Sequence, residues 1–322
     1  MGPGGCRELP AHQGRLHAAV GAEEHVLHRP GAAFHPELKG YARALPRTLV
    51  TPLTVPVFRR LPVLRRDPPA VRNVVLSSGV TVRVHQPRYG SNGSALLWIH
   101  GGGYLLGDAR MDDGLCARLA GEIEATVAAV QYRLAPANPY PAALDDCYEA
   151  LHWLSGHPDV DPARVAVAGA SAGGGLAAAL ALRVRDRSEM SLAAQLLIYP
   201  MLDDRTGSAA DPDAAKRRLW NAASNRRGWA SYLGGADPDT AVPARRDDLS
   251  GLAPAWIGVG TFDLLHDEAV RYGGRLEASG VCTELVTVPG AFHGFDAVAP
   301  KTAVARNFVR AQGVWLRDRL VV

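Results

Sequence analysis

The chain has 322 residues, of which 47% are hydrophobic and 21% charged, and its formal net charge at pH 7 is only +3. This is the composition of a globular protein with one or two domains. A net charge so close to zero, without a dense block of lysine and arginine, argues against nucleic acid as a partner.

The four cysteines (Cys6, Cys116, Cys147 and Cys282) lie far apart and form no C-x-x-C pair. Their spacing encodes neither a zinc site nor a disulfide framework, and we expect neither a metal nor a cofactor. Free thiols, and an N-terminal segment without an apolar signal sequence, lead us to expect a cytoplasmic protein. The uncharged run at residues 165–182 is rich in alanine and glycine, so we interpret it as a strand, a turn and a helix rather than a membrane span.

The first thirty residues show no sustained periodicity and are interpreted as a flexible arm. Proline punctuates residues 38–66, which permits only short helices, and we assign residues 1–69 to the arm and the first part of a cap. The β-branched runs at 72–76 and 80–85 flank a turn sequence, which is typical of a hairpin at the start of a sheet.

Short apolar runs then alternate with helical patterns. The runs expected to form buried strands are 95–99, 126–130, 164–168, 194–198, 255–259 and 283–288, and the helical patterns cover about 109–121, 141–154, 172–186, 266–279 and 302–318. This alternation predicts an α/β fold with a mostly parallel sheet flanked by helices. Residues 203–250 interrupt it with a polar stretch, so we assign them to a mainly helical cap insertion between two parts of the main domain, 70–202 and 251–322.

The sharpest chemical signal is the motif Gly169-Ala170-Ser171-Ala172-Gly173, which follows a predicted strand and precedes a predicted helix. A serine at such a turn has a strained backbone, and Gly169 and Gly173 remove collisions with the adjacent strand and helix. The helix also offers the free N–H of Ala172 and its positive dipole end to an anion. Ser171 is therefore a candidate nucleophile. The alternative is a packing turn without chemistry; nucleotide binding is excluded, because the glycine or Gly-Lys-Ser/Thr that it requires is absent.

The second signal is His100-Gly101-Gly102-Gly103, placed directly after a predicted strand. Consecutive glycines let backbone N–H groups approach a substrate oxygen, so Gly102 and Gly103 are predicted to form an oxyanion hole with Ala172. The alternative is a flexible turn. His100 is expected to orient the loop rather than to act as a base.

A serine nucleophile on this fold needs an acid and then a base later in the chain. Asp263 and His293 each follow a predicted strand, so both are expected at the sheet edge where Ser171 lies. His293 would transfer the proton and Asp263 would orient the imidazole. Asp267 and Glu268 are rival acids, for which a helix-dipole or supporting role is favoured. The other histidines, among them His152, His157 and His266, show no partner pattern and no metal-binding set.

Together these blocks resemble the hormone-sensitive-lipase-like branch of the α/β-hydrolases, the bacterial family IV esterases. Further shared blocks are Tyr132–Pro136, Tyr140–Ala143, Tyr199-Pro200, Asp263–Glu268 and His293–Phe295. The resemblance covers about residues 70–322 and implies an α/β-hydrolase fold whose catalytic domain is formed by 70–202 and 251–322. It also implies hydrolysis of small carboxylic esters, with short to medium acyl chains, through an acyl-enzyme.

Three residues of the predicted insertion resemble the cap of this branch: Asn225, Trp229 and Tyr232. Three positions depart from the family pattern, and they are Gln131, Ala137-Asn138 and Ala170. None removes a predicted catalytic group, so we expect them to change local hydrogen bonding and specificity.

Two alternatives keep the fold but change the activity. One is a non-catalytic small-molecule receptor, against which the intact His293 argues, and the other is an amidase or peptidase with the same triad. An exposed last strand at residues 283–288 also gives the hypothesis of a homodimer paired across a two-fold axis.

Overall fold

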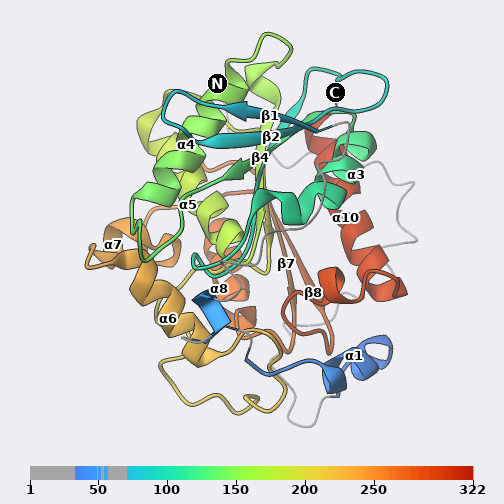
Figure 1. Ribbon diagram of the computed structural model, residues 1–322, viewed down its shortest axis with the longest axis vertical. Coiled ribbons are helices and arrows are strands. Elements are labelled where there is room, and N and C mark those ends of the chain that lie inside the picture. Colours follow the sequence, from blue (N-terminus) through green and yellow to red (C-terminus); the bar gives the residue numbers. More distant parts are fainter. Residues whose placement is uncertain (1–32, 49, 52–53, 57–70, 322) are drawn as a thin grey trace. The chain divides into compact units, whose positions relative to one another are not determined.

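The computed structural model describes residues 33–48, 50–51, 54–56 and 71–321 (Figure 1). The predicted N-terminal arm and the part of the predicted cap at residues 57–69 lie outside these ranges. The architecture is that of the compact unit Phe34–Val322.

An eight-stranded sheet with the order β1-β2-β4-β3-β5-β6-β7-β8 forms the centre of this unit (Figure 1). β2 runs antiparallel to both of its neighbours, and every other pair is parallel. This is an α/β-hydrolase fold, and the predicted hairpin and strands are all present, with bounds that differ by at most one or two residues. The strands are β1 (Val71–Val75), β2 (Thr81–His85), β3 (Ala95–Ile99), β4 (Thr126–Gln131), β5 (Val165–Ala170), β6 (Ala194–Ile198), β7 (Ala255–Gly260) and β8 (Thr283–Val288).

Helices cover both faces of the sheet, which explains why its central strands read as continuous apolar runs. Every residue of β3, β6 and β7 is buried. α3 and α10 pack together on one face and α4 and α5 pack together on the other, while α8 packs on β7 and β8 (Figure 1). These helices are α3 (Asp113–Ile123), α4 (Ala142–Ser155), α5 (Ala172–Arg187), α8 (His266–Ala278) and α10 (Ala303–Leu320), with shorter elements at η4 (Ala109–Asp112), η5 (Pro162–Arg164) and α9 (Phe295–Val298).

The insertion at residues 203–250 contains helical elements joined by turns and loops, and no strand lies in it. They are α6 (Ala222–Leu233), α7 (Pro238–Ala241) and η6 (Pro243–Arg245), while the proline-punctuated segment before the sheet forms the short η3 (Pro36–Leu38) and α1 (Lys39–Ala44). These two segments contact each other: the N–H of Leu219 donates to the carbonyl of Pro46 (3.0 Å), and the Ser224 hydroxyl donates to the carbonyl of Val50 (3.1 Å). Their assignment as two parts of one cap stays a prediction.

Three other expectations concern the described part of the chain. Cys116 and Cys147 are buried free thiols there. No described helix has the length and apolar character needed to cross a bilayer, since the run at 165–182 is divided between β5 and α5. β8 is an edge strand of the sheet, and its pairing in a homodimer stays a prediction.

Candidate active site

Ser171 occupies the turn between β5 and α5. Its backbone angles, φ 57° and ψ −120°, lie outside the regions that residues with a side chain normally adopt. The Ser171 N–H donates to the carbonyl of Ile198 (2.9 Å), and its carbonyl accepts from the N–H of Met201 (2.9 Å). The end of β6 and the loop after it therefore hold the strained turn.

The two glycines that flank Ser171 are required by close backbone contact. A Cβ atom at Gly173 would lie 2.5 Å from the carbonyl oxygen of His100 and closer still to that of Ile99. A Cβ atom at Gly169 would lie 2.8 Å from the carbonyl oxygen of Ile99 and closer still to that of Gly173. The predicted reason for glycine at both positions is thus confirmed.

The structure brings Ser171, His293 and Asp263 together from three different loops. His293 Nε2 lies 3.0 Å from Ser171 Oγ, and His293 Nδ1 lies 2.7 Å from Asp263 Oδ2. The other Asp263 oxygen accepts the N–H of Leu265 (2.9 Å). Ser171, Asp263 and His293 are only 5%, 1% and 8% exposed, so this chain of hydrogen bonds is shielded from water. It can remove a proton from the serine hydroxyl and hold the resulting imidazolium.

The rival acids have other partners. Asp267 Oδ1 lies 2.8 Å from Nδ1 of His266, so His266 has a partner that the sequence did not indicate. Glu268 is buried, and its Oε1 accepts the N–H groups of Leu202 (2.7 Å) and Asp203 (3.4 Å). Burial raises the pKa of Glu268 to about 8, although the Thr206 side chain and these N–H groups oppose the shift. Asp263, and neither of these two acids, is the carboxylate that is hydrogen-bonded to His293.

The glycine loop after β3 lies beside Ser171. Gly102 and Gly103 have φ +124° and +62°, and within the described part of the chain their N–H groups and that of Ala172 donate to no other protein group. A Cβ at Gly102 would come within 2.6 Å of the carbonyl carbon of Leu106, and one at Gly103 within 2.7 Å of the Trp220 ring. Close contact with neighbouring atoms of the protein therefore requires glycine at both positions. The sequence predicted glycine there for another reason, the approach of a substrate oxygen.

His100 is buried beneath this loop. Its Nδ1 lies 2.8 Å from the carbonyl oxygen of Gly101, and its ring stacks on Tyr132 with centroids 4.2 Å apart. The Tyr132 hydroxyl donates to the carbonyl of His100 (3.0 Å). Burial lowers the pKa of His100 to about 4, so the imidazole is neutral at pH 7. These contacts fit the expected orienting role.

Sequence reasoning missed two aromatic neighbours of His293. The Tyr199 ring packs edge-on to the imidazole at 4.9 Å, and its hydroxyl donates to Asp296 Oδ1 (3.0 Å). The centroids of the Trp220 ring and the imidazole are 6.2 Å apart. The sequence indicated Tyr199-Pro200 only as a block shared with the family, not as a contact of His293. Trp220 lies in the insertion and belongs to no motif.

Arg217 is a third residue without a sequence signal. Its Nη1 donates to the backbone carbonyl of Asp263 (2.9 Å), and Asp211 holds its Nε and Nη2 at 2.9 Å each. The insertion therefore contacts the backbone of the residue that is hydrogen-bonded to His293.

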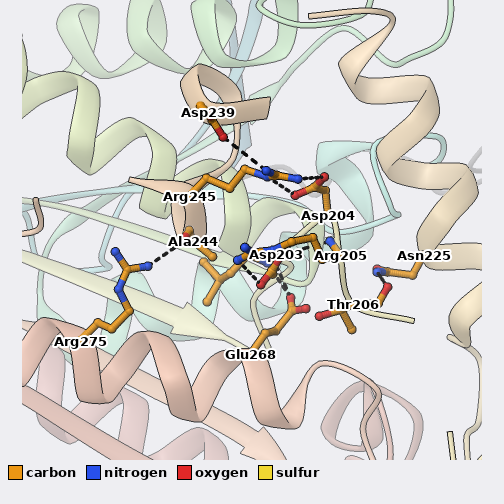
Figure 2. A network of polar contacts seen from close by, with 11 residues as sticks. Asp203, Asp204, Arg205, Thr206, Asn225, Asp239, Ala244, Arg245, Glu268 and Arg275 are labelled. Atoms are coloured by element: carbon orange, nitrogen blue, oxygen red, sulfur yellow. Dashed lines mark hydrogen bonds and ion pairs between the residues drawn. The ribbon is translucent and has the colours of Figure 1, made fainter. Parts of the chain in front are cut away.

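A polar network joins the two ends of the insertion to each other and to α8 of the main domain (Figure 2). Arg245 forms a bidentate pair with Asp204 (2.7 and 2.9 Å) and a longer contact with Asp239 (3.3 Å). From α8, Arg275 donates to the carbonyl of Ala244 (2.5 Å). The insertion is thus held largely by arginine side chains, several of which bind backbone carbonyl groups.

Comparisons with known proteins identify the fold family of the chain and relatives that are named as esterases. The profile of a family with the α/β-hydrolase fold matches residues 96–297. The chain is 36% identical to carboxylesterase NlhH of Mycobacterium tuberculosis, over 82% of this chain and 85% of that one, and 35% identical to an acetyl-hydrolase of Streptomyces hygroscopicus, over 70% and 76%. Among solved structures, a bacterial heroin esterase is 34% identical, with a TM-score of 0.80 over 90% of this chain and 99% of that chain.

Proposed function

The chain belongs to the α/β-hydrolase fold family, in its hormone-sensitive-lipase-like branch, and is a carboxylic ester hydrolase; from this premise we propose that it hydrolyses esters with short to medium acyl chains through an acyl-enzyme on Ser171. The observation that carries the proposal is the hydrogen-bonded series from Ser171 Oγ through His293 to Asp263, with distances of 3.0 and 2.7 Å.

In the first half of the reaction, Ser171 Oγ attacks the carbonyl carbon of the ester while His293 Nε2 takes its proton. The carbonyl oxygen becomes an oxyanion, which the N–H groups of Gly102, Gly103 and Ala172 stabilise. When the intermediate collapses, the carbon–oxygen bond to the alcohol breaks and His293 returns the proton to the alcohol oxygen. The acyl group is then esterified to Ser171.

In the second half, a water molecule attacks the acyl carbon and gives its proton to His293. The ester bond to Ser171 breaks, the proton returns to Oγ, and the carboxylic acid leaves. Asp263 keeps a proton on Nδ1 in the resting state and stabilises the imidazolium in both halves. Each step uses only groups of this chain, substrate and water.

A relative named for a short acyl group supports the preference for short to medium acyl chains. The acetyl-hydrolase of Streptomyces hygroscopicus is similar to this chain over 76% of its own length.

The experiment is a series of p-nitrophenyl esters, from acetate to palmitate, assayed with wild type and Ser171→Ala. We expect wild type to prefer the short esters and Ser171→Ala to lose about 10⁴-fold or more of kcat. Ser191→Ala, an exposed serine between α5 and β6, is the matched control and should retain full activity.

Four results would contradict the proposal. Unchanged turnover by Ser171→Ala would remove the nucleophile, and faster hydrolysis of palmitate than of acetate would remove the chain-length preference. Wild type that hydrolyses anilides as fast as esters would favour an amidase, and wild type inert on the whole series would favour a receptor.

A further inference from the structure

We propose that Trp220 is a specificity-determining residue, whose indole ring forms the wall of the site on the side of the leaving alcohol, and that Asn225 is the positioning residue that holds this ring. The inference rests on the proposed hydrolysis at Ser171. It adds that the insertion contacts the alcohol portion of the ester.

Trp220 lies between the glycine loop and α6. It is 4% exposed, and its Cη2 and Cζ3 atoms lie so close to Gly103 that no Cβ fits there. On the α6 side, a Cβ at Gly228 would lie 3.4 Å from Cη2 of the same ring and 2.9 Å from the carbonyl oxygen of Gly103. Small residues on both sides therefore allow the indole to reach the loop that is proposed to bind the oxyanion.

The same ring borders His293. The two ring centroids are 6.2 Å apart, and the planes are inclined by 32°. In the tetrahedral intermediate the former carbonyl oxygen points toward Gly103, and the departing oxygen points toward His293 Nε2. A side chain that contacts the first group and faces the second lies beside the alcohol portion. The rigid indole then limits how bulky that alcohol can be.

Asn225, which is fully buried on α6, fixes the orientation of the indole. Its Oδ1 accepts the Trp220 Nε1–H (3.1 Å), and its Nδ2 donates to the carbonyl of Thr206 (2.8 Å). Both ends of the amide are used, so a rotated amide would place a donor against a donor. Loss of either bond leaves a buried polar group without a partner, which favours one position of the ring.

The Thr206 end of this chain of contacts leads back to the main domain. Thr206 follows Leu202 and Asp203, whose N–H groups Glu268 binds from the first turn of α8 (Figure 2). α8 begins three residues after Asp263. The ring of Trp220 is thus tied to an element next to the residue that orients His293.

The test compares two substrate series. In the first the acyl group is always acetyl and the alcohol grows from ethyl to cyclohexyl; in the second the alcohol is always p-nitrophenol and the acyl chain grows. For Trp220→Ala we expect the ratio of kcat/KM for cyclohexyl acetate over ethyl acetate to rise roughly tenfold or more. The rank order of the acyl series should stay as in wild type. Trp315→Ala, at a tryptophan of α10 that is 6% exposed, is the control and should leave the ratio unchanged.

Trp220→Phe provides a second variant that keeps a ring but removes the N–H donor, and it serves if Trp220→Ala does not fold. It should raise the same ratio by a few fold. An unchanged ratio in a folded Trp220 variant, or a shift of the acyl series instead, would overturn the proposal.

Asn225→Ala tests the positioning role through a double-mutant cycle. Alone, it should raise the alcohol ratio in the same direction as Trp220→Ala, but less. In the Trp220→Ala background it should have no further effect, because the ring that it positions is gone. Equal loss on all esters, or additive effects of the two changes, would contradict the role. Ser171→Ala, assayed alongside, separates the two hypotheses. Turnover by Ser171→Ala refutes the acyl-enzyme. If Ser171→Ala is inactive and the alcohol ratio of the Trp220 variants equals that of wild type, only the role of Trp220 is refuted.

Discussion

The turn at Ser171 and the insertion at residues 203–250 both border the candidate site, but different contacts hold them. At the turn, backbone packs on backbone, and Gly169 and Gly173 have no room for a Cβ atom. In the insertion, side chains bind backbone carbonyl groups and carboxylates, as Arg217 and Arg245 do. Side-chain contacts can be exchanged one at a time, whereas the backbone packing cannot. From this difference we infer that the main domain determines the reaction and that the insertion determines the substrate preference.

The comparison is tested most severely at Gly173. Gly173→Ala forces a Cβ against the carbonyl groups of Ile99 and His100, so we expect loss of several kcal/mol of unfolding free energy or of the folded state, and loss of ester hydrolysis. Gly121→Ala, in α3 where a Cβ meets nothing, is the matched control and should gain about 1 kcal/mol. Urea unfolding and kcat/KM measure both. A Gly173→Ala variant with normal activity would show that the turn is adjustable after all.

Glu268 joins α8 of the main domain to the start of the insertion, and its titration should change the free energy of unfolding. Burial raises the pKa of its carboxyl in the folded state from 4.5 to about 8, so the folded chain retains a proton that the unfolded chain has released. Its contribution to stability is therefore present below pH 4.5 and is lost as the pH rises through about 8. Glu268→Gln keeps the acceptor for Leu202 but does not titrate, so its stability relative to wild type should rise between pH 5 and pH 8.5 by a few kcal/mol.

Urea unfolding of both proteins at the two pH values measures this change. A constant difference between wild type and Glu268→Gln would mean that the carboxyl titrates in its ordinary range and does not couple the insertion to α8 through its protonation.

A smaller effect is expected within the insertion. Arg245→Ala removes the bidentate pair with Asp204, in which the two side chains are 26% and 14% exposed, so we expect a loss of about 1 kcal/mol. Because the turn at Ser171 is held independently, kcat/KM for a short ester should stay within a few fold of wild type. Arg118→Ala, at an exposed position of α3, is the control and should change stability by less than about 0.5 kcal/mol. Loss of activity in folded Arg245→Ala would contradict the separation of the two regions.

Sequence patterns were sufficient for the parts of the fold with strong local signals. The strands at 95–99, 194–198 and 283–288 have the predicted bounds, because a glycine, proline or serine lies within three residues of each end of these apolar runs. β5 instead continues to Ala170, two residues beyond the predicted end. The prediction ended the strand early because glycine is typical of turns, whereas Gly169 pairs with Leu197 of β6. The motif predicted the close packing at this glycine, but local composition could not show that the glycine is also part of the strand.

The candidate site divides in the same way. Ser171, Asp263 and His293 each follow a strand, and parallel strands bring their carboxyl ends to one edge, so their proximity could be expected from order alone. Trp220 and Arg217 lie in a segment without periodicity, where position depends on partners as distant in sequence as Gly103 and Asp263. Such tertiary contacts leave no local pattern.

The most direct test of the central claim, that Ser171 is the nucleophile, is labelling with a fluorophosphonate, followed by intact mass and peptide mapping. We predict a single adduct on the peptide that contains Ser171, formed in parallel with the loss of ester hydrolysis, and no adduct on Ser171→Ala. Ser191→Ala should be labelled like wild type. An adduct on another residue, or inhibition without an adduct on Ser171, would contradict the account.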